Sequence, residues 1–193
     1  MAHVLERVAA VAAVETVLVV CAEARHPDVH AIARGIGLRG VQCVPGGARR
    51  RDSVAAGLAE VGDAEIVVVH DAARPLVSAG LIEAVIAAAR LHGAATAAIP
   101  CVDTIKRVAM GMVVETPPRD SLVAVQTPQA FAADLLRRAH AANPERDASD
   151  DCLLVEWLGE PVAVVAGELG NRKITHPEDL EWLRGRLQGS ARP

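Results

Sequence analysis

Aromatic side chains are almost absent from this chain of 193 residues, which contains one Phe, two Trp and no Tyr. Proteins that bind single-stranded nucleic acids stack the bases on aromatic rings, and nucleic-acid-binding domains in general carry an excess of Lys and Arg. Here 20 basic residues stand against 24 acidic ones, and the formal net charge is -4. We therefore expect no nucleic acid among the partners of this protein.

Long apolar runs are also missing, since nothing approaches the roughly 18 consecutive apolar residues that a membrane span needs. The four cysteines, Cys21, Cys43, Cys101 and Cys152, lie far apart without a C-x-x-C pair, which argues against a zinc site or a disulfide framework. These absences predict a soluble protein of the reducing cytoplasm with no membrane partner. Hydrophobic residues make up 51% of the chain, enough for one domain spanning residues 1–193.

Short apolar runs alternate with helical patterns along most of the chain. The runs are typical of strands buried on both faces of a sheet, and they span residues 16–22, 41–44, 66–70, 94–99, 122–126 and 162–165. The helical patterns span residues 53–61, 79–91, 130–141, 150–158 and 177–187. This alternation predicts a single-domain α/β protein with a mostly parallel sheet. Residues 103–119 break the rhythm and are predicted to form a protruding β-hairpin arm.

The most informative segment is His70-Asp71-Ala72-Ala73-Arg74-Pro75, which follows the apolar run Val67-Val68-Val69. Ligands of α/β proteins bind at the carboxyl ends of strands, because helices cover both faces of the sheet and leave a crevice there. Asp71 and Arg74 are therefore candidate site residues. With the segments described next, they indicate a transferase that acts on phosphates.

Two glycine-rich segments have different interpretations. Gly35-Ile36-Gly37-Leu38-Arg39-Gly40 matches G-x-G-x-x-G, but it follows a helical pattern and precedes a strand, the reverse of the order in dinucleotide-binding sites. We interpret it as a loop. Pro45-Gly46-Gly47-Ala48-Arg49-Arg50-Arg51-Asp52-Ser53 leads from a strand into a helix, so its N–H groups and arginines could hold an anion. Taken alone, it could equally be a solvated basic turn with Asp52 or Ser53 as N-cap.

The arm carries candidate residues at both of its ends, in Asp103-Thr104-Ile105-Lys106 and in Thr116-Pro117-Pro118-Arg119. Pairing of the hairpin would bring Thr104 and Arg119 together, so that a hydroxyl and a guanidinium could share one anion. The arm could equally be a dimerisation element, a lid over a ligand, or a solvated loop.

Three later segments complete the set of candidates. Gln126-Thr127-Pro128-Gln129 is expected at a strand end, although Thr-Pro by itself could be a simple stop signal. Asp147-Ala148-Ser149-Asp150-Asp151 begins a helix, where acidic residues commonly just complement the helix dipole. Lys173 comes shortly after the last predicted strand, in position to reach the crevice.

At this point five motifs resemble those of the 2-C-methyl-D-erythritol 4-phosphate cytidylyltransferase family. They are, in order, Asp52-Ser53-Val54-Ala55-Ala56-Gly57-Leu58, His70-Asp71-Ala72-Ala73-Arg74-Pro75, Asp103-Thr104-Ile105-Lys106, Gln126-Thr127-Pro128-Gln129 and Lys173-Ile174-Thr175-x-Pro177-Glu178-Asp179-Leu180. Each motif alone is weak, but five in register from about Met1 to Leu187 are specific. The resemblance implies a Rossmann-like nucleotidyltransferase sheet with a protruding arm.

The resemblance also implies the reaction. The phosphate of the polyol would attack the α-phosphorus of CTP and release pyrophosphate, as one step of non-mevalonate isoprenoid biosynthesis, so that no protein nucleophile is needed. The protein would align the substrates and stabilise negative charge with Lys, Arg and Mg²⁺.

Roles follow from the matching motif positions. The polyol phosphate would be held by Thr104, Arg119, Thr127, Ser149 and Lys173, of which Thr104 and Arg119 would come from the arm of a partner subunit in a homodimer. Asp71, Arg74 and Lys173 would be catalytic, and Asp71 would contact the metal ion. The nucleotide would contact Gly47, Ser53, Asp71 and Ala72.

One departure from the family is large. Its members begin with a strand and a glycine-rich loop with an arginine and a Pro-Lys pair around the triphosphate, whereas Met1-Ala2-His3-Val4-Leu5-Glu6 matches the helix that follows that loop. We therefore expect an N-terminally incomplete domain that lacks a central strand, leaving unpaired backbone groups in the sheet. Two alternatives stay open: a cytidylyltransferase acting on another polyol phosphate such as ribitol phosphate, and a non-catalytic relative that dimerises through the arm.

Overall fold

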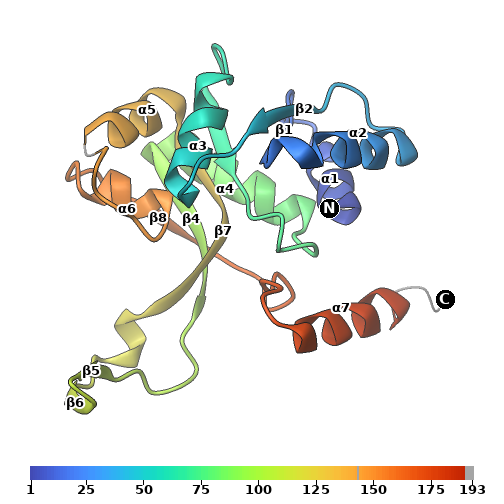
Figure 1. Ribbon diagram of the computed structural model, residues 1–193. Coiled ribbons are helices and arrows are strands. Elements are labelled where there is room, and N and C mark those ends of the chain that lie inside the picture. The colour runs from blue at the N-terminus through green and yellow to red at the C-terminus, as the bar shows by residue number, and fades with distance from the viewer. Residues whose placement is uncertain (143, 190–193) are drawn as a thin grey trace.

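The computed structural model describes residues 1–142 and 144–189, in which helices and strands alternate as predicted (Figure 1). The strands are β1 (Leu18–Cys21), β2 (Gln42–Pro45), β3 (Ile66–Val69), β4 (Ala94–Pro100), β5 (Arg107–Ala109), β6 (Met112–Glu115), β7 (Val123–Ala132) and β8 (Ala163–Ala166). The helices are α1 (Ala2–Ala9), α2 (His26–Gly35), α3 (Arg50–Ala59), α4 (Ala79–His92), α5 (Ala133–Ala142), α6 (Asp151–Glu156) and α7 (Pro177–Gly189), with 3-10 turns η1 (Glu23–Arg25) and η2 (Arg119–Ser121).

The strands form three ladders within the described residues. β1 and β2 pair in parallel, β5 and β6 form the arm, and a four-stranded sheet has the order β3-β7-β4-β8. In that sheet β4 and β8 are parallel, whereas β7 is antiparallel to both β3 and β4. The arm leads the chain from β4 straight into β7, and strands joined in this way run in opposite directions. The domain is thus α/β. Outside the arm, β1–β2 and β4–β8 are parallel pairs, and β7 forms antiparallel pairs with β3 and with β4.

β7 is longer than the sequence predicted. A strand over residues 122–126 and a helix from residue 130 were expected, whereas β7 continues to Ala132 and α5 begins at Ala133. Ala130 and Phe131 pair with β3 and are fully buried. Alanine has a high helix propensity, but pairing and burial between two strands decide the conformation here. As a result, Thr127 lies in the middle of a strand and not at its end.

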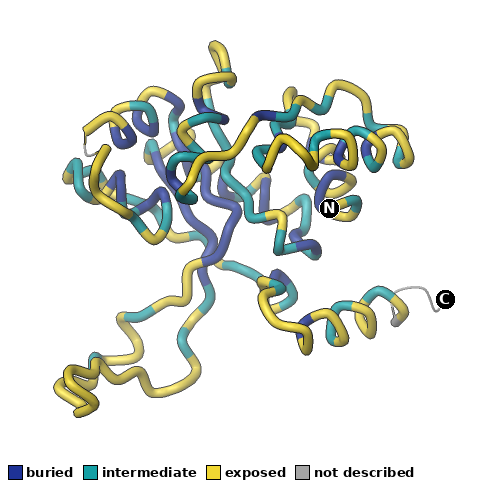
Figure 2. The backbone as a smooth tube through the Cα atoms, in the orientation of Figure 1, coloured by how far each residue is buried: buried dark blue, intermediate teal, exposed yellow. Residues whose placement is uncertain are grey.

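Helices cover both faces of the four-stranded sheet, and its two inner strands, β4 and β7, contain long buried runs (Figure 2). On one face α4 contributes Ile82 and Val85 to a core cluster. On the other face Phe131 of β7 packs with Leu136 of α5 and Leu154 of α6. Residues 94–98 of β4 are all buried, and four of these five are alanines, whose small side chains let the helices approach the sheet closely. A third cluster packs α1 and α2 against the β1–β2 pair.

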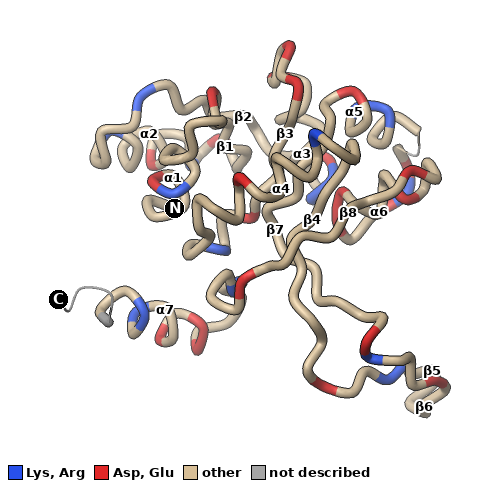
Figure 3. Tube along the Cα trace, turned by 180° about the vertical axis from the view of Figure 1, so that it is seen from behind, with Lys and Arg blue, Asp and Glu red and all other residues tan. Residues whose placement is uncertain are grey.

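Two segments project from this body, the arm and α7 (Figures 1 and 3). All residues of β5 and β6 are exposed. Helix α7 makes no extended contact with any other described helix or strand. Among the described residues, no helix has the length and apolar character needed to cross a membrane.

Candidate active site

The turn after β3 is held in place by the hydroxyl of Thr127 on the neighbouring strand. The backbone N–H of Asp71 donates to Thr127 Oγ1 at 2.9 Å, and Thr127 Oγ1 lies 3.2 Å from His70 Nδ1. His70 Nε2 lies 3.1 Å from the carbonyl oxygen of Arg74, which can only accept, so Nε2 carries the proton and Nδ1 accepts from Thr127. Burial lowers the pKa of His70, in agreement with a neutral ring. This closed set of hydrogen bonds fixes the direction of the Asp71 side chain.

Three cations surround the carboxylate of Asp71. Lys173 Nζ lies 2.8 Å from Oδ2, Arg74 Nε lies 3.9 Å from Oδ2, and Arg50 Nε lies 3.8 Å from Oδ1. Burial by itself would raise the pKa of Asp71, but the hydrogen bond and charge of Lys173, together with the charges of Arg50 and Arg74, hold it below its usual value. The carboxylate is therefore ionised at neutral pH and lies within a locally positive site.

Arg50 connects this carboxylate to a second, deeper one. Its Nη1 donates to Asp151 Oδ2 at 2.8 Å, and Asp151 Oδ1 lies 3.0 Å from His140 Nε2. The Asp151 side chain is fully buried at the start of α6, where a charge is stable only if it is paired. Ser149 is an exposed residue two positions before Asp151 in the chain.

The glycine loop between β2 and α3 approaches the site from the two-stranded sheet, and not from the edge of the sheet that contains β3. Gly46 N donates to the carbonyl oxygen of Cys21 at 3.0 Å, and Gly47 N donates to Ser53 Oγ at 3.1 Å. A Cβ atom at Gly47 would lie 2.4 Å from the Cβ of Asp52, so only glycine fits this turn. Since Arg50 is the first residue of α3, the loop and the Asp71 carboxylate meet at this helix start.

The segment between β8 and α7 joins the site through its backbone. Ile174 N donates to the carbonyl oxygen of Ala73 at 2.8 Å, and Arg74 Nη1 donates to the carbonyl oxygen of Asn171 at 2.8 Å. Asn171 is fully buried, and its Nδ2 donates to the carbonyl oxygen of Thr127 at 2.8 Å. These bonds place Lys173 against Asp71.

The structure thus brings Arg74, Thr127 and Lys173 into contact with Asp71. Ala72 is the next residue along the chain, Gly47 and Ser53 lie at the start of the helix that carries Arg50, and Ser149 forms no hydrogen bond with this set within the described residues. Thr104 and Arg119 do not join them within one chain, because both lie on the exposed arm. There Arg119 Nη1 donates to the carbonyl oxygen of Val102 at 3.1 Å, which bridges the two ends of the arm as expected.

Sequence reasoning missed Arg50, Asp151 and His140 as members of the site. Arg50 lies inside the glycine segment, where three consecutive arginines gave no basis for choosing one. Asp151 could have been noticed as an acid that the helical pattern of residues 150–158 turns toward the core, but its partner His140 belongs to another helix, which only the fold brings near.

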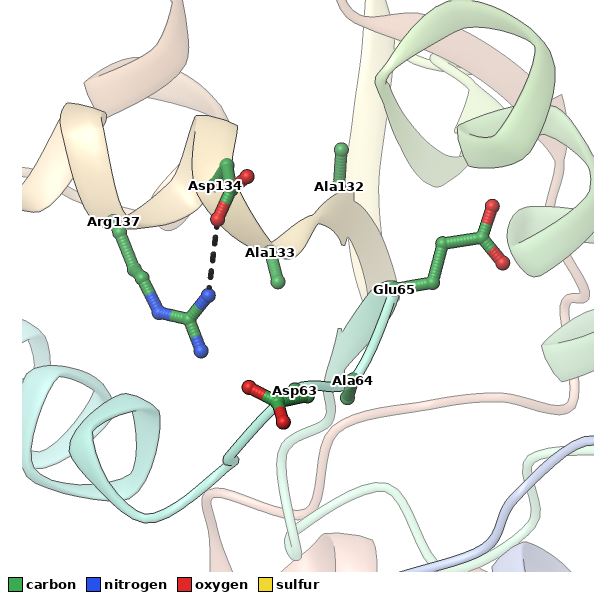
Figure 4. A pocket seen from close by; sticks show the side chains of 7 residues that line it. All are labelled: Asp63, Ala64, Glu65, Ala132, Ala133, Asp134 and Arg137. Carbon is green, nitrogen blue, oxygen red and sulfur yellow. Dashed lines mark hydrogen bonds and ion pairs between the residues drawn. The ribbon is translucent and has the colours of Figure 1, made fainter.

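A separate cavity lies away from this site. It has a volume of about 410 Å³ and lies at the amino end of β3, at the opposite end of that strand from Asp71 (Figure 4). Arg137 crosses it, donating to Asp134 Oδ1 at 3.1 Å and to the carbonyl oxygen of Gly62 at 2.6 Å. The remaining lining residues are Asp63, Ala64, Glu65, Ala132 and Ala133. No predicted site residue lines this cavity.

The donor set for a metal ion is sparse. No group of three or more His, Cys, Asp or Glu side chains converges within the described part of the chain. Asp71 offers one carboxylate at the site, and one of its two oxygens, Oδ2, lies 2.8 Å from Lys173 Nζ. This set fits an ion such as Mg²⁺ that is bound mainly by substrate phosphates and takes one protein carboxylate, and it does not fit an ion held by the protein alone.

Comparison with known proteins gives a consistent result. A sequence model of the 2-C-methyl-D-erythritol 4-phosphate cytidylyltransferases matches residues 1–185. The enzyme of that name from Pelotomaculum thermopropionicum is 47% identical over 184 residues, covering 92% of this chain and 77% of the relative. The one from Syntrophotalea carbinolica is 43% identical over 178 residues, covering 86% of this chain and 74% of the relative.

Solved structures agree with these relatives. The 4-diphosphocytidyl-2C-methyl-D-erythritol synthase of Anaerococcus prevotii superposes with a TM-score of 0.90 at 30% identity, over 97% of this chain and 85% of that one. The 2-C-methyl-D-erythritol 4-phosphate cytidylyltransferase of Thermus thermophilus gives 0.82 at 38% identity, over 96% of this chain and 87% of that one.

Proposed function

The chain belongs to the 2-C-methyl-D-erythritol 4-phosphate cytidylyltransferase family, and we propose that it joins CTP to this polyol phosphate with release of pyrophosphate. The observation that carries the proposal is the Asp71 carboxylate among three cations, beside a glycine loop and at the carboxyl end of β3. One carboxylate among three cations leaves a positively charged site, which favours the binding of two anionic substrates close to each other.

The chemistry needs alignment more than a reactive side chain. A phosphate oxygen of the polyol phosphate attacks the α-phosphorus of CTP, the bond to the β-phosphate breaks, and pyrophosphate leaves. Fixed cations lower the barrier by stabilising the charge on the phosphate oxygens in the transition state. Arg74 and Lys173 supply this charge, and Asp71 holds both of them in position between the substrates.

Each substrate has its own group of residues in this proposal. Gly47, Ser53 and Ala72 face the nucleotide, because the glycine turn before α3 allows a ligand to approach the backbone closely. Lys173, Thr127 and Ser149 hold the polyol phosphate. The ammonium of Lys173 has three donors and uses one on Asp71, so that two are free for phosphate.

Thr127 contributes to this group mainly as a support, because it is 5% exposed and both hydrogen bonds of its hydroxyl brace the turn that carries Asp71. Mg²⁺ would enter with the triphosphate, with Asp71 as its one protein ligand, and would neutralise phosphate charge.

We propose that the active form is a homodimer in which the arm supplies Thr104 and Arg119 to the partner's site. Three apolar side chains of the arm, those of Met110, Met112 and Val113, are 100%, 70% and 59% exposed. Side chains of this kind are normally covered by a partner. The four free cysteines fit a reducing compartment such as the cytoplasm.

The test is a pyrophosphate-release assay with CTP and 2-C-methyl-D-erythritol 4-phosphate, run beside ribitol 5-phosphate and other polyol phosphates. We expect release that requires both substrates and a divalent metal, with a higher kcat/KM for the methylerythritol compound. Calorimetric titration with CTP is the second readout. A folded chain that neither binds CTP nor releases pyrophosphate would overturn the assignment, whereas a preference for ribitol phosphate would replace the substrate only.

A further inference from the structure

Helix α7 carries an apolar stripe that the described residues cover only in part: Leu180 is exposed, and Leu183 and Leu187 are half-buried. Leu180, Leu183 and Leu187 recur at spacings of three and four residues and therefore share one helix face. Leu180 is 45% exposed. The helix makes no extended contact with another helix or strand of the described chain, and it stands away from the body in Figure 1.

The start of α7 is nevertheless firmly joined to the active site. Asp179 accepts from the backbone N–H groups of Thr175 and His176, at 2.9 Å each, and pairs with Arg172 at 2.6 Å. These residues flank Lys173, which contacts Asp71. The apolar stripe therefore begins directly beside the site and has a defined direction from it.

The arm is the second segment whose apolar side chains are exposed in the described chain. Val108 pairs with Val113 on one face of the hairpin, and Ala109 pairs with Met112 on the other, so both faces present apolar side chains to solvent. From Thr104 to its tip at Met110 the arm reaches about 20 Å at roughly 3.3 Å per residue. The 13 residues of α7 also extend about 20 Å at 1.5 Å per residue.

The positions of the two segments relate them by symmetry. Both project from the same side of the body, in opposite directions, in the front view of Figure 1 and in the reverse view of Figure 3. In a symmetric dimer with its two-fold axis between these segments, the arm of one copy would reach α7 of the other, and the reverse contact would form at the same time.

We propose that the apolar stripe of α7 is the docking surface for the tip of the partner subunit's arm. This inference rests on the arm exchange in the proposed function: with the base of the partner's arm beside Lys173, its tip lies along the helix that starts four residues later. Each segment then covers the apolar side chains that the other leaves exposed. The stripe would thus determine the affinity with which the partner's arm binds beside the site.

Sedimentation equilibrium of the full chain tests the proposal with Leu180→Asp and a matched control, Leu91→Asp. Leu91 is 77% exposed near the end of α4. An acid is favourable in the first turn of a helix and unfavourable in the last, so the control is the more damaging of the two to folding. We expect Leu180→Asp to raise the dimer Kd about 100-fold, tenfold at each of two symmetric contacts, and Leu91→Asp to leave it unchanged.

Met112→Asp separates failure of this inference from failure of the arm exchange. If Met112→Asp dissociates the dimer and Leu180→Asp does not, the arm docks elsewhere and only the α7 proposal is overturned. A wild-type chain that is monomeric at all concentrations would overturn the exchange as well, while pyrophosphate release still tests the activity.

Cross-linking adds a second readout that does not depend on dimer stability. Leu180→Cys and Met112→Cys proteins are mixed and treated with a short bis-maleimide. A linked pair that forms only in the mixture, and not in either protein alone, supports the contact. Its absence from a mixture that still forms dimers counts against the contact.

Discussion

Replacement of Asp71 by Asn removes one charge and almost no volume from the centre of the site. The carboxylate that is lost lies 2.8 Å from Lys173 and between 3.8 and 3.9 Å from the two arginines. Its side chain is 17% exposed. The change leaves three cations close together without their shared anion, and we expect both stability and turnover to fall.

The size of the stability loss follows from these distances. One pair of unit charges about 4 Å apart interacts by roughly 4 kcal/mol at an effective dielectric constant of about 20. Most of this is offset by the desolvation of Asp71 and by solvent around Lys173, which is 45% exposed. We expect a net loss of about 1–2 kcal/mol in the free energy of unfolding, between the values for exposed and buried pairs.

The loss must depend on pH with a definite sign. The pKa of Asp71 is lower in the folded protein than in the unfolded chain, where a carboxyl of this type titrates near about 3.9. Its contribution is therefore complete above the unfolded value and disappears as pH falls through the folded value. Wild type and variant should differ at pH 7 and converge at the acid end of the accessible range.

Urea unfolding at several pH values, followed by circular dichroism, measures this difference. Asp63→Asn is the matched control, since Asp63 is exposed and the substitution is the same. A difference at pH 7 that persists unchanged in acid would refute the electrostatic reasoning. Global unfolding of the variant would show instead that Asp71 supports the fold more than the reaction.

Three other predictions concern the site and its surroundings. Lys173→Ala and Arg119→Ala should each raise the KM for the polyol phosphate at least tenfold more than the KM for CTP. The reason is that each substitution removes a charged hydrogen-bond donor, which contributes about 1.5–3 kcal/mol. Equal increases in the two KM values in steady-state kinetics would contradict the assignment of these residues to the polyol phosphate. Asp151→Asn should lower the free energy of unfolding by about 3 kcal/mol in urea titrations, because it leaves Arg50 without its buried partner. Asp179, whose pKa is lowered to about 2 by its backbone N–H donors, stabilises the start of α7 above about pH 4. The protection factors against amide exchange at Thr175 and His176, which compare the measured rate with the intrinsic rate at the same pH, should fall as pH falls toward 2, and Asp179→Asn should remove that dependence.

The position of the site could be predicted from the sequence, because the ends of buried strands can be recognised in it. Asp71 and Arg74 come directly after an apolar run, which ends at these polar residues. Gly47 lies in a turn between a strand and a helix. Both features depend on local chemistry, and in an α/β fold they imply one common edge. In the structure Arg74 and Lys173 contact Asp71, and Arg50, at the start of the helix after Gly47, contacts it as well.

Other parts of the site depend on contacts between distant segments. Thr127 was expected at a strand end, but it is buried in mid-strand and reaches Asp71 from the side, because the arm returns the chain as an antiparallel neighbour of β3. The pairing of Arg50, Asp151 and His140 joins three helices. No periodicity in a single sequence encodes which helices meet, so these partners could not be chosen in advance. The missing glycine-rich loop and the roles of Thr104, Arg119 and Ser149 stay predictions.

The position of helix α3 explains how the two halves of the site are kept in register. The glycine loop extends from the two-stranded sheet, whereas Asp71 extends from the four-stranded one, and no ladder joins β1 to β3 in the described chain. Helix α3 contacts both halves: a Cβ at Gly57 would lie 2.9 Å from Val20 of β1, and Leu58 packs in the core cluster of α5 and α6. Arg50 at its first turn then contacts Asp71 and Asp151. The distance between the glycine loop and the Asp71 carboxylate is therefore fixed by side-chain packing and ion pairs along one helix, so we expect that a substitution on α3 far from both groups still changes their relative position.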